Sequence, residues 1–424
     1  METLPREIWD EIMAIVISFN EKDDIRSLRL VNKYLAKISA PALFASVSVW
    51  FGVQSLQHLT NISRHYELAQ YVHEIRFSPL QIRRTEQPSS RGFLNLRDNL
   101  TKNDLYASEI LEQIERDAQY QRYRAAQVYL LKTHAALELL RSAFCRLPGV
   151  QKIDILLMDR STGAKELGKF FGDLEGTEYY WDLGTTLPLL FTALKALPSP
   201  LHCFRFQDTD NTWSPKKRLR NSSGSYTRHS IGMKALLQLS QDHDFTHLET
   251  LELNYYYSEP IERDKRNQDV FDQYSASVKT ILHRAPHLKS MRIQIPGKDH
   301  QGDEGEAENR YRFTKALSEE PCLHLTSLEL IDLTISVAAP LSAMLAKHFF
   351  KLRHVLLQVG DNPRKWLGFL AAQRRPGWHV LRSFKMVFYS YALVTEEPDV
   401  EVAAFVRMKV LENPLLPCLY PDSE

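Results

Sequence analysis

Two pairs of histidines have a spacing that could hold a metal ion on an α-helix. His243 and His247, and again His283 and His287, lie four residues apart, so each pair would share one helix face. Neither pair has a specified third ligand, and Pro286 places the second pair at a helix end. The sequence therefore predicts no metal centre.

Other kinds of chemistry also lack their motifs. The chain contains no glycine-rich phosphate loop, no Gly-x-Ser-x-Gly elbow, no His-Glu-x-x-His helix and no kinase motif set. A short basic run at 216–220 (Lys-Lys-Arg-Leu-Arg) is typical of a solvated loop, with a nuclear-localisation patch or an anion-binding edge as alternatives. We therefore expect no catalytic residues and no cofactor.

Composition restricts the class of partner. The 424 residues carry 53 basic and 52 acidic side chains, so no global field favours nucleic acid or an anionic membrane as the main partner. The four cysteines are widely separated, which argues against a disulfide scaffold and a thiolate zinc site. Without a signal-like segment or a long apolar run, we expect a cytoplasmic or nuclear protein.

The first fifty residues show two helix patterns. The first begins near Pro5, which is favoured at a first helical position, with Glu7 in the first turn. Its apolar stripe, widened by Trp9 and Met13, comprises Ile8, Ile12, Ile15 and Val16. A second helix is predicted from Asp23 or Asp24, ending before Pro41. So short a module cannot build a sufficient core alone, and we expect it to need a partner surface.

This segment resembles a known adaptor-binding module. Leu4-Pro5-Arg6-Glu7-Ile8, followed by Leu28-Arg-Leu-Val31-Asn32-Lys33 and Ala40-Pro41-Ala42-Leu43-Phe44, is similar to the F-box of fungal proteins. The resemblance implies a three-helix F-box over residues 1–50 that docks on the Skp-type adaptor of an SCF ubiquitin ligase and, through it, on a cullin. The adaptor contacts that it implies are Leu4, Pro5, Ile8, Leu28, Val31 and Lys33. Asn32 and Leu35 depart from the cysteine and tryptophan frequent in the family. The alternative is that these residues simply cap the following domain.

A second pattern recurs through residues 51–424. The template apolar-x-x-apolar-x-apolar occurs at 72–77, 150–155, 201–206, 248–253, 288–293, 325–330, 352–357 and 381–386. The end of each occurrence alternates like a short strand with one buried face. Helical periodicity precedes most of them, so the strands should be mostly parallel. The pattern favours an α/β fold in the form of an irregular leucine-rich-repeat-like solenoid, with an α/β sheet lacking solenoid curvature as the alternative.

The irregular spacing of the template requires insertions. We place them near 78–125, 207–230 and 296–309, where polar, Gly- and Pro-containing segments predict surface loops. Within the first, residues 78–104 are predicted as a loop. An amphipathic helix then begins near Asp104 and continues to Leu147.

Taken together, these features predict a binding protein and not an enzyme. The resemblance implies the substrate-recognition subunit of an SCF-type ubiquitin ligase, with the repeat domain binding an unidentified target protein. Tyr255, Tyr256 and Tyr257 directly follow a template strand and are candidate target contacts. Two alternatives stay open: an F-box scaffold that does not feed ubiquitination, and an enzyme with a pocket in an α/β domain.

Overall fold

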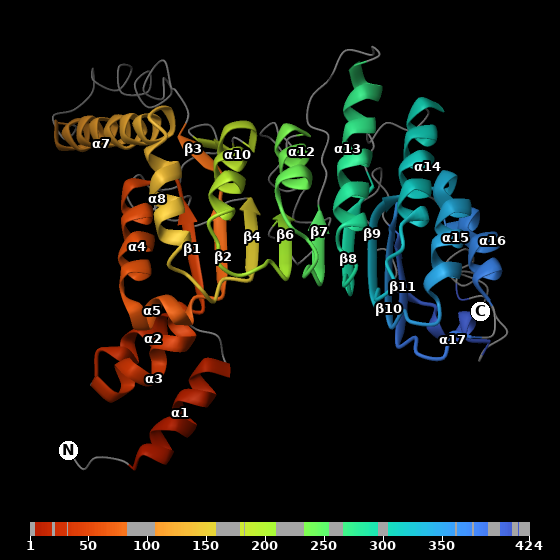
Figure 1. Cartoon of the computed structure of the whole chain (residues 1–424), viewed down its shortest axis with the longest axis horizontal. Coiled ribbons are helices and arrows are strands. Elements are labelled where there is room, and N and C mark those ends of the chain that lie inside the picture. The colour runs from red at the N-terminus through yellow and green to blue at the C-terminus, as the bar shows by residue number, and fades with distance from the viewer. Residues whose placement is uncertain are drawn as a thin grey trace. The chain divides into compact units, whose positions relative to one another are not determined.

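The chain forms two compact units in the computed structural model, Met1–Ser199 and Pro200–Glu424 (Figure 1). The structure describes residues 5–18, 22–31, 33–82, 107–157, 179–181, 183–208, 233–253, 266–295, 304–360, 363–374, 377–388, 399–408 and 414. Each unit carries its own parallel strands and its own helices.

Three helices open the first unit: α1 (Arg6–Ser18), α2 (Lys22–Arg29) and α3 (Lys33–Phe44). The prediction of one continuous second helix is therefore wrong. Leu30 N donates to Ser27 O and Val31 N donates to Leu28 O, and these tight turns end α2. Pro41 lies inside α3, not beyond it. It removes a single backbone hydrogen bond near the helix end, where packing of the neighbouring apolar side chains keeps the turn helical.

The parallel strands of the first unit are β1 (Ser46–Trp50), β2 (Glu74–Ser78) and β4 (Lys152–Leu157), in that order. Its further helices include α4 (Val53–Arg64), α5 (Tyr66–Tyr71), α8 (Ala135–Phe144) and α10 (Leu183–Leu194). Helix α8 packs between α4 and α10, so these three helices form one layer (Figure 1).

A second, antiparallel sheet pairs β3 (Leu80–Ile82) with β5 (Tyr179–Trp181). Helix α7 (Ala107–Lys132) holds β3 through the buried amide of Gln127. Gln127 Oε1 accepts from Ile82 N at 2.8 Å, and Nε2 donates to Leu80 O at 3.0 Å. The side chain thereby takes the place of a neighbouring strand. Residues 80–82 are therefore part of the fold and not of the loop predicted over 78–104.

The helix predicted from Asp104 to Leu147 is also divided. Helix α7 ends at Lys132 and α8 begins at Ala135, with His134 between them in the left-handed conformation at φ 56°. A left-handed residue cannot continue a right-handed helix. The periodicity of the sequence continued through the break because both helices bury apolar residues.

In the second unit six parallel strands follow one another in sequence order: β6 (Cys203–Asp208), β7 (Thr250–Leu253), β8 (Ser290–Gln294), β9 (Ser327–Leu333), β10 (His354–Val359) and β11 (Ser383–Phe388). Strand β12 (Asp399–Glu401) joins β11 antiparallel. The predicted α/β fold with a mostly parallel sheet is confirmed.

The helices that the structure describes in this unit are α12 (Met233–Asp242), α13 (Arg266–His283), α14 (Glu304–Glu319), α15 (Ala338–His348), α16 (Pro363–Gln373), α17 (Ala403–Val406) and the 3-10 helix η2 (Ile335–Val337). From α12 to α16, each helix packs against the next along the chain (Figure 1). The loop predicted over 296–309 is wrong from Glu304 onward, because α14 begins there. Most of the loop predicted over 207–230 lies outside the described residues.

The apolar template marks the core of both units. In all eight occurrences the three apolar side chains are at most 5% exposed. The strands also begin in the same way: Thr326 O accepts from Arg353 N (2.7 Å) and His354 N (3.1 Å) of the following occurrence. The same double acceptance recurs at the carbonyl oxygens of Ala45, His73, His202, Glu249, Lys289 and Arg353. This repeated contact aligns the strands although the segments between them differ in length.

Among the helices that the structure describes, none has both the length and the apolar character needed to cross a membrane.

Candidate docking residues on the N-terminal helices

Helix α1 carries two apolar stripes. Trp9, Met13 and Val16 pack with Ile25 of α2 and Leu35 of α3 in the core of the N-terminal helices. The second stripe, Ile8, Ile12 and Ile15, is offset by one residue, which turns it about 100° around the helix axis. Ile8 is 40% exposed and Ile15 53% exposed. One stripe therefore holds the helices together and the other faces outward.

The turn between α2 and α3 exposes two more apolar side chains. Leu30 is 87% exposed and Val31 61% exposed, although Ile25, one turn earlier on α2, is buried. Helix α2 ends at Arg29, so Leu30 and Val31 do not continue its apolar face. We call Ile8, Ile15, Leu30 and Val31 the N-terminal apolar residues.

The residues expected to contact an adaptor differ in how far they are exposed. Pro5, Ile8, Val31 and Lys33 are exposed, whereas Leu28 is half-buried against the core of the N-terminal helices. Leu4 lies outside the described residues. The sequence reasoning did not include Ile15 and Leu30 among the contacts.

A signal for Ile15 was present in the sequence. Ile8, Ile12 and Ile15 have the i, i+4, i+7 spacing of one helix face, and a second such set at Trp9, Met13 and Val16 already filled the inner face. Leu30 had no comparable signal, because the second helix was predicted to run through it. Recognising its exposure required knowing where α2 ends.

The tyrosines proposed as target contacts, Tyr255, Tyr256 and Tyr257, lie outside the described residues. The histidine pairs lie within them, but neither pair shares a helix. Helix α12 ends before His243 and α13 ends at His283, which leaves His247 and His287 in the following turns. Within the described ranges, no group of three or more His, Cys, Asp or Glu side chains could hold a metal ion.

The polar positions of β2 and β4 form an ion-pair cluster in the first unit. Lys152 Nζ lies 3.1 Å from Glu74 Oε1 and 3.2 Å from Asp154 Oδ2, and Arg76 Nε lies 2.9 Å from Glu74 Oε1. Burial, together with the neighbouring Glu74 carboxylate, raises the pKa of Asp154 to about 7. Burial would also raise the pKa of Glu74, but the hydrogen bond with Asp154 and the two cations lower it to about 2. Below about pH 7 the pair therefore carries one negative charge, which lies on Glu74, and Asp154 keeps its proton.

The second unit has comparable pairs on its strands. Arg205 on β6 faces Glu252 on β7 at 3.2 Å, and Arg292 on β8 faces Glu329 on β9 at 3.2 Å. These side chains occupy the strand positions that alternate with the buried template residues. Each cation therefore stands opposite an acid on a neighbouring strand, and the pairs support the register of the sheet.

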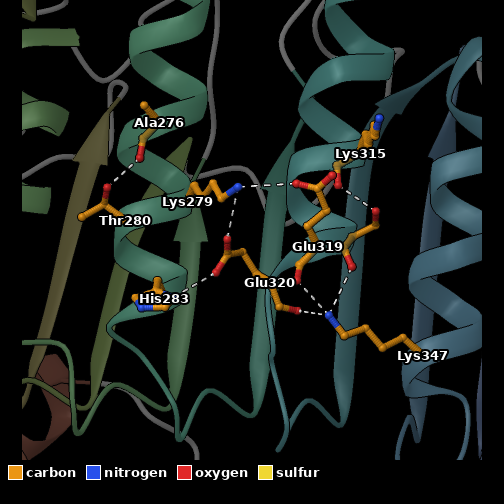
Figure 2. A network of polar contacts seen from close by, with 9 residues as sticks. Ala276, Lys279, Thr280, His283, Lys315, Glu319, Glu320 and Lys347 are labelled. Atoms are coloured by element: carbon orange, nitrogen blue, oxygen red, sulfur yellow. Dashed lines mark hydrogen bonds and ion pairs between the residues drawn. The ribbon is translucent and has the colours of Figure 1, made fainter.

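Figure 2 shows a polar network that joins α13, α14 and α15. Lys347 Nζ on α15 donates to the carbonyl oxygens of the last two residues of α14, Ser318 (3.3 Å) and Glu319 (3.0 Å), and to that of Glu320 directly after it (2.7 Å). The buried Glu320 carboxylate lies 3.7 Å from Lys279 Nζ and 3.6 Å from His283 Nδ1, both on α13. Lys347 thus caps the C-terminal end of α14. The contacts of this network link consecutive helices, which is a structural role.

The sequence was also compared with known proteins. No protein-family model matches the chain, and no curated protein matches it significantly.

Proposed function

We propose that this chain is the substrate-recognition subunit of an SCF-type ubiquitin ligase. In this proposal the N-terminal helices are an F-box that docks on a Skp-type adaptor, and the strand-rich remainder is a leucine-rich-repeat-like solenoid that holds a target protein. The exposure of the N-terminal apolar residues is the observation that carries the proposal.

Physical reasoning supports a protein partner for these residues. Removing a leucine or valine side chain from water is worth roughly 1.5–3 kcal/mol, so four such side chains represent a large unused stabilisation. Among the side chains that the structure describes there, the apolar core of the N-terminal helices consists of the buried Met13, Ile25 and Leu35. Several exposed apolar side chains on so small a module are typical of a protein-binding surface. The quoted F-box-like motif supports a Skp-type adaptor as that partner.

The proposed mechanism is proximity and involves no bond chemistry by this chain. An adaptor bound to the N-terminal helices would connect the chain to a cullin and its conjugating enzyme. A target held by the second part of the chain would then meet the conjugating enzyme at a high effective concentration. Such a receptor would work in the cytosol or the nucleus.

Binding of the full-length protein to a purified Skp-type adaptor tests the proposal. We expect micromolar or tighter binding by the wild type and at least about a hundredfold loss in Leu30→Glu/Val31→Glu, because each change places a charge in a desolvated contact. Tyr129→Glu on α7 is the matched control, since Tyr129 is also a large exposed side chain of the first unit. It should bind like the wild type.

Absence of binding by the wild type, or an equal loss in the control, would contradict the F-box assignment.

A reconstituted ubiquitination reaction then separates a ligase receptor from a scaffold. Modification of a bound target that disappears in Leu30→Glu/Val31→Glu supports the receptor, whereas adaptor binding without any modification supports the scaffold.

A further inference from the structure

A second group of exposed apolar side chains lies in the second unit. Among its described residues, the large apolar side chains that stand exposed are Leu323, Phe350, Val380 and Met408, each 40–58% exposed. The first three lie in consecutive turns, directly before β9, β10 and β11. Exposed apolar residues are common singly, but here one occurs in the turn before each of three consecutive strands.

Strand register brings these turns together. His354, at the start of β10, pairs with Ser327 of β9 and with Ser383 of β11. The three strands are parallel, so their preceding turns lie side by side at the edge where the strands begin. We call the segments 321–326, 349–354 and 377–382, with residues 407–408, the strand-entry edge.

Direct contacts hold neighbouring turns of this edge together. Lys351 Nζ donates to Leu323 O at 2.5 Å, which links the first turn to the second. The rings of Phe349 and Trp378 lie 6.0 Å apart, which links the second to the third. Gly377 has φ 115°, and a Cβ atom there would stand 2.3 Å from the Phe349 ring. The close approach of these two turns therefore requires glycine.

The end of α17 extends the edge. Arg407 Nη1 donates to Leu381 O at 2.8 Å, which places the segment after α17 against the third turn. Met408 follows directly and is exposed, as is Val380 in the third turn. The exposed apolar positions thus continue from the turn before β9 to the residue after Arg407.

The charge of the edge has one sign. Its segments contain no Asp or Glu, and their basic residues are His324, Lys351, Arg353, His354, His379, Arg382 and Arg407. Arg353 and Arg382 are exposed, and neither side chain forms an ion pair with any residue that the structure describes. In a chain with a net charge of only +1, this is a local concentration of positive charge beside apolar side chains.

We propose that the strand-entry edge binds an acidic segment of a partner protein that carries apolar anchor residues. Leu323, Phe350 and Val380 would receive the anchors, while Arg353 and Arg382 would pair with flanking carboxylates, bidentately where geometry allows. An anionic membrane shares this chemistry but fits less well. Three neighbouring turns span only about 10 Å, the length of about three extended residues, whereas membrane association needs a broader apolar face.

The test uses full-length protein and fluorescein-labelled peptides in an anisotropy assay. One short peptide has Leu and Phe flanked on both sides by Glu, and its partner has Gln in place of every Glu. The apolar variant is Leu323→Ser/Phe350→Ser and the charge variant is Arg353→Glu/Arg382→Glu. Arg122→Glu/Tyr129→Ser on α7 is the control, because both of these side chains are exposed in the first unit.

We expect saturable binding of the Glu peptide, weakened at least about tenfold in the apolar and charge variants and unchanged in the control. The Gln peptide should bind at least about tenfold more weakly, and added salt should weaken binding of the Glu peptide. Thermal unfolding of each variant checks that the fold is retained; should the double changes disturb it, the single changes Phe350→Ser and Arg382→Glu replace them.

Four results would overturn the inference: no binding of the Glu peptide, equal binding of the Gln peptide, equal weakening in the control, or stronger binding to phosphatidylserine vesicles that the same variants abolish. The assay contains no adaptor, so its failure is distinct from failure of the proposed F-box docking.

Discussion

The N-terminal helices and the sheet strands depart from the usual distribution of side chains in opposite directions. The N-terminal helices leave Leu30 and Val31 in water, whereas the strands of the first unit bury Asp154 and half-bury Glu74. The buried carboxyl groups have cations within 3.2 Å. The exposed Leu30 and Val31 side chains gain no comparable stabilisation from the residues that the structure describes.

This difference distinguishes unusually placed side chains that the fold itself explains from those whose placement suggests a function. A buried charge with its partners in place is explained by the fold itself, because the ion pairs offset desolvation. An exposed apolar side chain contributes little to the fold that exposes it, so folding alone does not account for its presence. The same reasoning applies to the strand-entry edge, where Phe350 is exposed next to strands whose template residues are all buried.

The largest expected effect comes from truncating one leucine in each of the two environments and comparing the losses of stability. Leu330→Ala on β9 removes a fully buried side chain and should lower the free energy of unfolding by about 2–5 kcal/mol. Leu30→Ala removes the same atoms from an exposed site and should change it by less than about 0.5 kcal/mol. Urea denaturation followed by tryptophan fluorescence measures both, and similar losses in the two variants would remove the contrast.

Much of the fold could be predicted because burial constrains the strands so strictly. Leu248, Leu251 and Leu253 illustrate the template: side chains alternate along a strand, and only one face meets the helices, so spacing alone located the buried positions. The pattern missed β1, which belongs to no template occurrence, and α16, although α16 precedes the occurrence at 381–386. It also extended helices through Leu30 and His134, where the apolar spacing continued but the backbone turned.

The candidate sites depend on neighbours that are remote in sequence, which limits what spacing can show. The outward stripe of α1 was visible at Ile8, Ile12 and Ile15 because one helix contains it. The strand-entry edge was not, since Leu323 and Phe350 become neighbours only through the pairing of β9 with β10. The Glu74 and Lys152 pair likewise required the register of β2 with β4.

A smaller effect should follow from removing the shared cation of the first unit. Lys152→Met leaves Glu74 and Asp154 facing each other with Arg76 as their remaining cation, and should cost about 1–3 kcal/mol, discounted because Lys152 is partly exposed. Lys315→Met on α14 is the control, since its exposed side chain forms no ion pair with a described residue. If urea denaturation shows that Lys315→Met lowers the free energy of unfolding as much as Lys152→Met does, the ion pairs of Lys152 do not stabilise the fold beyond what an exposed lysine contributes.

The smallest expected effect is a pH dependence of the same cluster, measured as the difference in Tm between Asp154→Asn and the wild type. The folded state raises the pKa of Asp154 from 3.8 to about 7, so the folded wild type retains a proton that the unfolded chain has lost. The stability from this group is therefore full below about pH 4 and is lost as pH rises through about 7.

Asparagine cannot ionise, so the Tm of Asp154→Asn relative to the wild type should rise between pH 5 and pH 8. Glu74, with its pKa lowered to about 2, stays ionised throughout this window. Asp244→Asn supplies the contrast: a hydrogen bond from Thr246 lowers the pKa of this exposed carboxyl group, so its Tm difference should be flat over the same window. A flat difference for Asp154→Asn as well would mean that Asp154 is already ionised at pH 5 in the folded protein, where we infer that only Glu74 carries a negative charge.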